Sequence, residues 1–199
     1  MKVDPLTRTT LTVPAPLALA TVAATPGTTA EPWNVDQPHT EINFSVKHFF
    51  TPVSGTFRDF DVNLVYDRAN PSASSVEVRI AVSSVNTGNE RRDEHLRSGD
   101  FFEASAHPYI TFRSTSVRSA GEGRLVATGP LTIKGVTREI ELPITVLGVQ
   151  DSPSGMQEML GGVKRVAGFE AATGSGGRTS AWGWETGPPR WWWEGTWTS

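Results

Sequence analysis

The sequence of 199 residues contains no cysteine, no long apolar run and no basic cluster. Without cysteine, disulfide scaffolds, thiol nucleophiles, CxxC redox sites and cysteine-ligated zinc are excluded, and the redox compartment is not indicated. A membrane-spanning helix needs about 20 consecutive apolar residues, so stable membrane insertion is not expected. Lys and Arg never exceed two in a row and the formal net charge is −3, so a nucleic-acid partner is not expected either.

Motifs of common catalytic centres are also missing. The chain has no GxSxG elbow, no HExxH motif and no Gly-rich loop between a strand and a helix. His39, His48, His95 and His107 are not paired at a zinc-binding spacing, so no metal site is expected. Asp93 and His95 do lie close together in the sequence, which leaves an enzyme acting on small amphiphiles as an alternative.

The two ends of the chain differ in composition from its middle. Residues 1–30 contain Lys2 and Arg8, then small and apolar residues from Leu11 to Ala24, then a small-residue end. This layout predicts a secretory signal peptide, and a disordered arm is the alternative. Residues 174–199 hold every tryptophan except Trp33, beside Gly and Pro, so a protein-interaction module using this tail is a further alternative. Residues 31–173 are expected to form one domain.

Alternation with a period of two dominates the middle of the chain and predicts half-buried strands. It is clearest over residues 42–48, 76–82 and 139–146, where Pro143 indicates an edge strand or a distorted ladder position. Further strands are expected over 53–66, 108–118, 123–133 and 163–172, and the one helical pattern covers 89–102. About eight strands joined by short turns predict an all-β fold, either an antiparallel barrel or a sandwich.

Seven of the nine phenylalanines lie in these segments, mostly on the apolar register of the strands or on the helix. Such enrichment by itself is typical of an ordinary core. Eight strands closed into a barrel would leave an interior wide enough for one slender ligand.

Four groups of residues follow one another in a characteristic order. They are 33–36 (WNVD), 39–48 (HTEINFSVKH) and 53–57 (VSGTF); 85–89 (VNTGN) with 92–96 (RDEHL); 100–104 (DFFEA) with 108–112 (PYITF); and 129–138 (GPLTIKGVTR). Together, from about residue 33 to residue 173, they closely resemble the YceI-like family of lipid-binding proteins.

The resemblance implies an antiparallel eight-stranded lipocalin-like extended barrel with one short helical segment. The barrel would enclose a polyisoprenoid chain, such as an isoprenoid quinone or a prenyl phosphate, in bacteria and often in the periplasm. No catalytic cofactor is then expected, and the isoprenoid lipid or quinone is the ligand. A tube of Phe, Leu and Val suits a branched hydrocarbon, because apolar burial contributes about 25 cal/mol per Å² and needs few polar contacts.

The residues expected to line or shape this tube are Phe44, Val46, Phe57, Val78, Ile80, Leu96, Phe101, Phe102, Phe112, Leu131 and Ile133. Arg92, Asp93 and His95 are the polar candidates for a headgroup contact near one mouth, with a turn-fixing network as the alternative. A periplasmic or secreted protein is expected, or a cytoplasmic one if residues 1–30 are not a signal. The lipid's chain length and headgroup, the formation of a homodimer and the physiological process are left open.

The tail departs from the family's pattern in a specific way. After a segment like that at 168–173, the family continues with a pattern like Arg-Ile-Asn-Arg-x-Asp-Phe-Gly and an alternating strand. Tryptophan has a single codon, so residues 191–193 must be encoded TGG TGG TGG, which reads Val-Val-Val one base earlier if the Arg190 codon ends in G. The same shift turns residues 174–182 into Arg-Ile-Gly-Arg-Lys-Asp-Phe-Gly-Leu with suitable third bases. We therefore predict a frameshift near Thr173 and expect the chain as written to lack the closing strands of the barrel.

Overall fold

The computed structural model describes residues 30–48, 51–158, 161–173 and 190–198, and at residues 31, 46–48, 51, 156 and 190–198 it describes the backbone only. The strands are β1 (Glu31–His48), β2 (Thr51–Phe57), β3 (Phe60–Tyr66), β4 (Ser75–Ala81), β5 (Val85–Asn86), β6 (Tyr109–Arg113), β7 (Ser116–Ser119), β8 (Arg124–Ile133), β9 (Val136–Asp151), β10 (Arg165–Thr173) and β11 (Arg190–Thr198). The α-helices are α1 (Glu90–Arg97) and the single turn α2 (Ser154–Gln157). Two 3-10 turns, η1 (Pro71–Ala73) and η2 (Val82–Ser84), flank β4.

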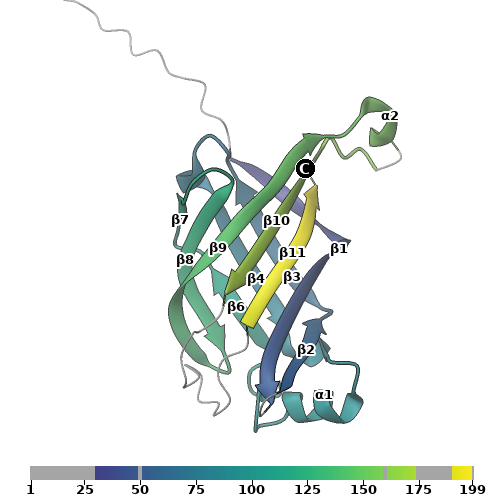
Figure 1. The fold of residues 1–199 in the computed structure, drawn as a ribbon, viewed down its shortest axis with the longest axis vertical. Helices are drawn as coiled ribbons and strands as arrows, with labels where there is room; N and C mark the ends of the chain where they lie inside the picture. The colour runs from purple at the N-terminus through teal and green to yellow at the C-terminus, as the bar shows by residue number, and fades with distance from the viewer. Residues whose placement is uncertain (1–29, 49–50, 159–160, 174–189, 199) are drawn as a thin grey trace, which may run out of the picture.

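The strands form one antiparallel sheet that closes on itself. Its order is β11-β10-β9-β8-β6-β4-β3-β1, and β11 also pairs with β1, so these eight strands form a ring. β2 pairs with the C-terminal half of β1, β5 pairs with β2, and β7 pairs with β8. Figure 1 shows the curled sheet with α1 at one end and α2 at the other. The predicted antiparallel eight-stranded barrel with a short helix is confirmed.

Alternation along the strands decides which side chains face the interior. In β3, Val62 and Leu64 are buried while Asp61 and Asn63 are exposed, because successive side chains of a strand point to opposite faces. Every strand of the ring with described side chains contributes buried apolar residues to one core, which fills the inside of the ring.

The predicted helix over 89–102 is shorter in the structure. Asn89 caps α1 by accepting a hydrogen bond from the backbone N–H of Arg92, and the chain leaves the helix after Arg97. Leu96 is the apolar residue of α1 that packs into the core, with 6% of its surface exposed.

Pro143 does not mark an edge strand. β9 lies between β8 and β10, and Pro143 pairs with Val126 of β8. The pairing of β9 with β10 begins only at Ile144, so the proline lies just outside that ladder, where a missing N–H is tolerated.

The tail supplies a strand that the sequence was not expected to provide. β11 pairs with β10 from Val166 opposite Thr198 to Thr173 opposite Trp191, and also pairs with β1. The expectation of a missing closing strand is therefore wrong: backbone N–H and C=O groups make the ladder, and the two edges of β1 and β10 offer partners to any extended segment. The predicted signal peptide and the shifted residues 174–182 lie outside the described residues.

Candidate ligand-binding cavity

An apolar cavity of about 80 Å³ lies inside the ring. Its lining residues are Ile42, Val78, Ile80, Ile110, Phe112, Leu131, Ile140, Leu142, Ala171 and Thr173. They come from six strands, β1, β4, β6, β8, β9 and β10. Only Thr173 among them carries a polar side chain, so this surface offers a ligand hydrocarbon contacts and almost no hydrogen bonds.

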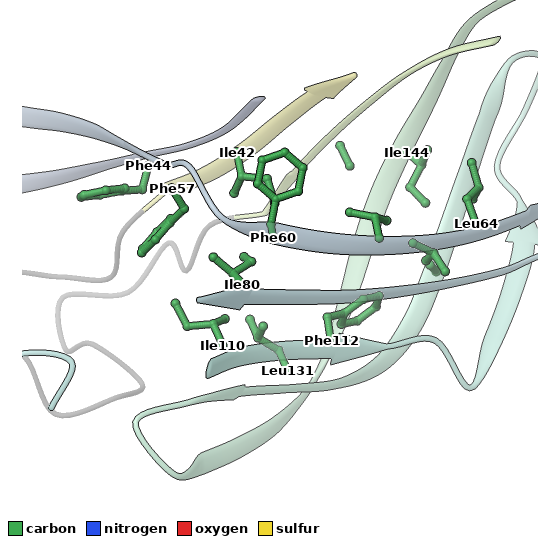
Figure 2. Packing of buried hydrophobic residues seen from close by; sticks show 14 of the residues in the cluster. Ile42, Phe44, Phe57, Phe60, Leu64, Ile80, Ile110, Phe112, Leu131 and Ile144 are labelled. Atoms are coloured by element: carbon green, nitrogen blue, oxygen red, sulfur yellow. The ribbon is translucent and has the colours of Figure 1, made fainter. Parts of the chain in front are cut away.

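Strand register brings these residues together. Ile80 of β4 lies opposite Ile110 of β6, and Phe112 of β6 lies between Val78 of β4 and Leu131 of β8. Figure 2 shows Ile80, Ile110 and Leu131 side by side on neighbouring strands. Such cross-strand neighbours have Cβ atoms about 4.5–5.5 Å apart, which makes a continuous apolar wall.

Four of the residues expected to form the tube line this cavity: Val78, Ile80, Phe112 and Leu131. The sequence analysis did not select Ile42, Ile110, Ile140, Leu142, Ala171 or Thr173. A signal for three of them was present, because Ile42, Ile140 and Leu142 occupy the apolar register of strands that alternation had predicted.

Three other predicted residues, Phe44, Phe57 and Phe102, form an aromatic cluster at the end of the barrel next to α1. The ring centroids of Phe44 and Phe57 are 5.3 Å apart, and those of Phe57 and Phe102 are 5.9 Å apart. All three are at most 2% exposed, and none of them lines the cavity. Figure 2 shows the rings of Phe44 and Phe57 next to one another, beyond Ile42. The aromatic cluster therefore belongs to the buried core at this end of the barrel.

Among the other apolar candidates, the three with described side chains, Leu96, Phe101 and Ile133, do not line the cavity. Ile133 is fully buried in the core, and Phe101 is half-buried with its ring centroid 4.9 Å from that of His95. Val46 lies on β1 opposite Val53, and its side chain lies outside the described part of the chain.

Two of the three polar candidates, Arg92 and Asp93, fix a turn at the start of α1. Asp93 is 5% exposed, and its Oδ1 accepts hydrogen bonds from the backbone N–H of Thr87 at 2.9 Å and from Thr87 Oγ1 at 2.6 Å. Arg92 donates from Nε to Thr87 Oγ1 at 2.7 Å and from a terminal nitrogen to the Thr87 carbonyl at 2.9 Å. For Arg92 and Asp93, these hydrogen bonds match the alternative that the sequence analysis gave, a network that fixes a turn.

His95 lies apart from that turn. Its side chain is 58% exposed, and its Nε2 lies 3.3 Å from Asp100 Oδ2. Arg92, Asp93 and His95 are all absent from the lining of the apolar cavity.

A second, more polar cavity of about 450 Å³ opens at the other end of the barrel, away from α1. We call it the mouth. Its lining residues are Tyr66, Arg68, Pro71, Ser119, Gly121, Glu122, Gly123, Arg124, Leu125, Val146, Gly148 and Val149. Tyr66 packs edge-on against Phe169 with ring centroids 5.3 Å apart. Burial raises the pKa of the Tyr66 hydroxyl, while Arg68 lowers it and Asp67 raises it further.

Comparison with known proteins gives concordant results. The family model of the YceI-like domain matches residues 33–183. Protein YceI of Escherichia coli O157:H7 is 40% identical over 134 residues, which is 67% of this chain and 65% of that protein, so the chain spans slightly under two thirds of that relative.

Two solved structures share the fold. BcnA of Burkholderia cenocepacia superposes with a TM-score of 0.65 at 20% identity, covering 82% of this chain and 99% of BcnA. A polyisoprenoid binding domain from Saccharophagus degradans, implicated in plant cell wall breakdown, superposes with a TM-score of 0.54 at 12% identity, covering 85% of this chain and 99% of that domain. None of the helices in the described residues is long and apolar enough to cross a membrane.

Proposed function

The chain belongs to the YceI-like family, and from this premise we propose that it binds an isoprenoid lipid inside its barrel and carries or stores it without catalysing a reaction. The ligand class is a polyprenyl chain, an isoprenoid quinone or a prenyl phosphate. The observation that carries this proposal is the apolar wall of the cavity, contributed by six strands of the ring.

The lining suits a branched hydrocarbon better than a polar metabolite. Isoleucine, leucine and valine side chains present methyl groups, and burying apolar surface contributes about 25 cal/mol per Å² without any need for directional contacts. The S. degradans fold neighbour is itself a polyisoprenoid binding domain, which supports the ligand class.

The same lining supports binding over catalysis. General acid–base catalysis needs a titratable group within hydrogen-bond reach of the reacting atoms. Among the residues with described side chains, no Asp, Glu, His or Lys belongs to the cavity wall, and Asp93 and Arg92 are engaged with Thr87.

The cavity is too small to hold an isoprenoid chain without a change in the lining side chains. An apolar cavity of roughly 150 Å³ holds about one benzene ring, whereas the cavity here measures about 80 Å³. A chain of several isoprene units must therefore part the lining side chains and run along the barrel interior.

A matched pair of variants on β10 tests the site. Ala171 is 3% exposed and lines the cavity, while the next residue, Ala172, points outward and is exposed. We expect wild-type protein purified from bacteria and Ala172→Phe to carry an isoprenoid in native mass spectra and organic extracts. Ala171→Phe should lose it, because the ring fills the cavity. A wild-type protein that is empty and takes up no added quinone contradicts the proposal.

Export to the periplasm or beyond the cell is part of the proposal, supported by the layout of residues 1–30. N-terminal sequencing of the chain from cell fractions tests it. A chain that starts at about residue 31 in the periplasmic or secreted fraction is expected, and an intact chain confined to the cytoplasm contradicts it.

A further inference from the structure

Trp33 holds a buried hydrogen-bond donor that has no acceptor. Its side chain is 4% exposed and belongs to the core, and its indole Nε1 has no hydrogen-bond partner in the described part of the protein. Buried polar groups are almost always paired, because an unpaired one has given up its hydrogen bond to water. An unpaired donor inside a barrel therefore points to an acceptor that arrives with a ligand.

Strand register places Trp33 just below the mouth. Tyr66, which lines the mouth, lies opposite Glu31, and Trp33 lies opposite Leu64, two residues further from the end of β3. Diagonal neighbours of this kind are about 7–8 Å apart, so the indole lies roughly one strand step deeper than the mouth wall.

The indole ring is also held in place. The Arg165 guanidinium lies over it, with Cζ 5.6 Å from the ring centroid, and Arg165 Nε is 3.5 Å from Asp151 Oδ1. A fixed ring presents its N–H in one direction and loses little further freedom when a ligand binds.

The two ends of the barrel differ in how well their polar groups are paired. In the described residues, the buried side-chain atoms without a partner are Trp33 Nε1, Asp67 Oδ2 and Ser152 Oγ. All three belong to the mouth end, since Asp67 directly follows β3 and Ser152 lies between β9 and α2 (Figure 1). At the α1 end, by contrast, Asp93, Arg92 and Thr87 hydrogen-bond to one another, and the rings of the aromatic cluster are at most 2% exposed.

From these observations, and resting on the proposed function, we propose that the lipid binds in one direction. Its hydrocarbon points toward the aromatic cluster, and a neutral oxygen of its head, such as a quinone carbonyl, accepts a hydrogen bond from Trp33 Nε1. A neutral head is proposed over a phosphate, because burying an anion beside the 4%-exposed Trp33 carries a large desolvation penalty.

Trp33→Phe tests the proposal because it keeps an aromatic ring and removes the N–H. Dissociation constants of wild type and variant are measured for an isoprenoid quinone, for squalene, which is an isoprenoid without oxygen, and for a prenyl phosphate. We expect the variant to bind the quinone about threefold to tenfold more weakly, the effect of one net hydrogen bond. Squalene binding should be unchanged.

Proton NMR of the indole N–H gives a second readout, in which the ligand response is measured on the wild-type protein. The Trp33 resonance, identified by its loss in Trp33→Phe, should move downfield when wild-type protein binds the quinone and stay in place with squalene.

The outcomes separate this inference from the proposed function. Suppose that wild type binds the quinone and squalene, that Trp33→Phe weakens the binding of both equally or of neither, and that the resonance does not respond to the quinone. The inference then fails and lipid binding stands. A Trp33→Phe effect on the prenyl phosphate alone also overturns it. If wild type binds none of the three probes, both proposals fail.

Discussion

The absence of a side chain at Gly55 leaves room for the aromatic cluster, and adding a single methyl group there should destabilise the barrel. Gly55 lies on β2 directly opposite Phe44. A Cβ at this position would lie 2.6 Å from Phe44 Cζ, 2.7 Å from Phe44 Cε1 and 2.8 Å from Thr87 Cγ2. Because Phe44 is 1% exposed and packs against Phe57, its ring has little space into which to retreat.

We expect Gly55→Ala to destabilise the protein by about 1–3 kcal/mol, the usual effect of overpacking a core. For a domain of this size each kcal/mol lowers Tm by roughly 2–4 °C, so the expected fall in Tm is about 2–12 °C. Thermal unfolding followed by circular dichroism measures this, and urea unfolding gives the free energy independently.

Gly148→Ala is the matched control. Gly148 lies on β9, no atom lies within 4 Å of a Cβ built there, and its φ is not in the left-handed region. This variant should be unchanged or stabilised by about 0.4–1 kcal/mol through the unfolded state. Phe44→Leu combined with Gly55→Ala should show a favourable coupling, since the shorter side chain relieves part of the clash and Thr87 keeps the rest. Equal stability of the two alanine variants, or strict additivity with Phe44→Leu, would refute the packing argument.

Four further predictions concern the polar groups and the tail. Asp93→Asn with His95→Ala should leave lipid loading within a few fold, because neither side chain lines the cavity; loss of a hydrolytic activity on lipid esters would instead support the enzyme alternative. Burial raises the pKa of Tyr66 above its usual value. The buried neutral hydroxyl therefore contributes its full share to the free energy of unfolding below about pH 10, and this share is lost as the pH rises through the raised pKa. In urea unfolding, the free energy of unfolding of Tyr66→Phe should fall less at alkaline pH than that of wild type, whereas Tyr109→Phe should fall as wild type does. Deleting residues 174–199 should lower Tm and increase binding of a hydrophobic dye, because β11 pairs with both β1 and β10; a truncated chain as stable as the full one contradicts this. Resequencing the gene across the codons for Ala172 to Arg178 should reveal one base that restores Arg-Ile-Gly-Arg-Lys-Asp-Phe-Gly, and a confirmed present frame ends the frameshift hypothesis.

Local pattern was sufficient to predict the strands and their inward faces. Ile42 and Phe44 are buried and Glu41 is exposed, as alternation required, because the period of two is a property of the strand itself. The cap at Asn89 and the short α1 also follow from residues close together in the sequence. The resemblance of four ordered blocks added the barrel topology.

Alternation does not tell which inward residues border a void. Phe44 and Phe57 were expected to line or shape the tube and pack against each other outside the cavity lining, whereas Ile110 and Ala171 line the cavity although neither was selected. The difference depends on neighbours from strands far apart in the chain, such as Ala171 of β10 and Ile42 of β1, which both border the same space only after the sheet has closed.

Asp93 and Arg92 bind Thr87 and not the cavity, and this network is local, because Thr87 lies only six and five positions before them. Two other features depend on the tertiary structure. Trp33 is left with an unpaired N–H only because the barrel buries it below the mouth. The tail, whose composition predicted no strand, lies between β1 and β10 and completes the ring. In each case the sequence determined which groups were available, and the closure of the sheet determined which of them meet, since hydrogen bonds and apolar contacts depend on distances in space and not on separation along the chain.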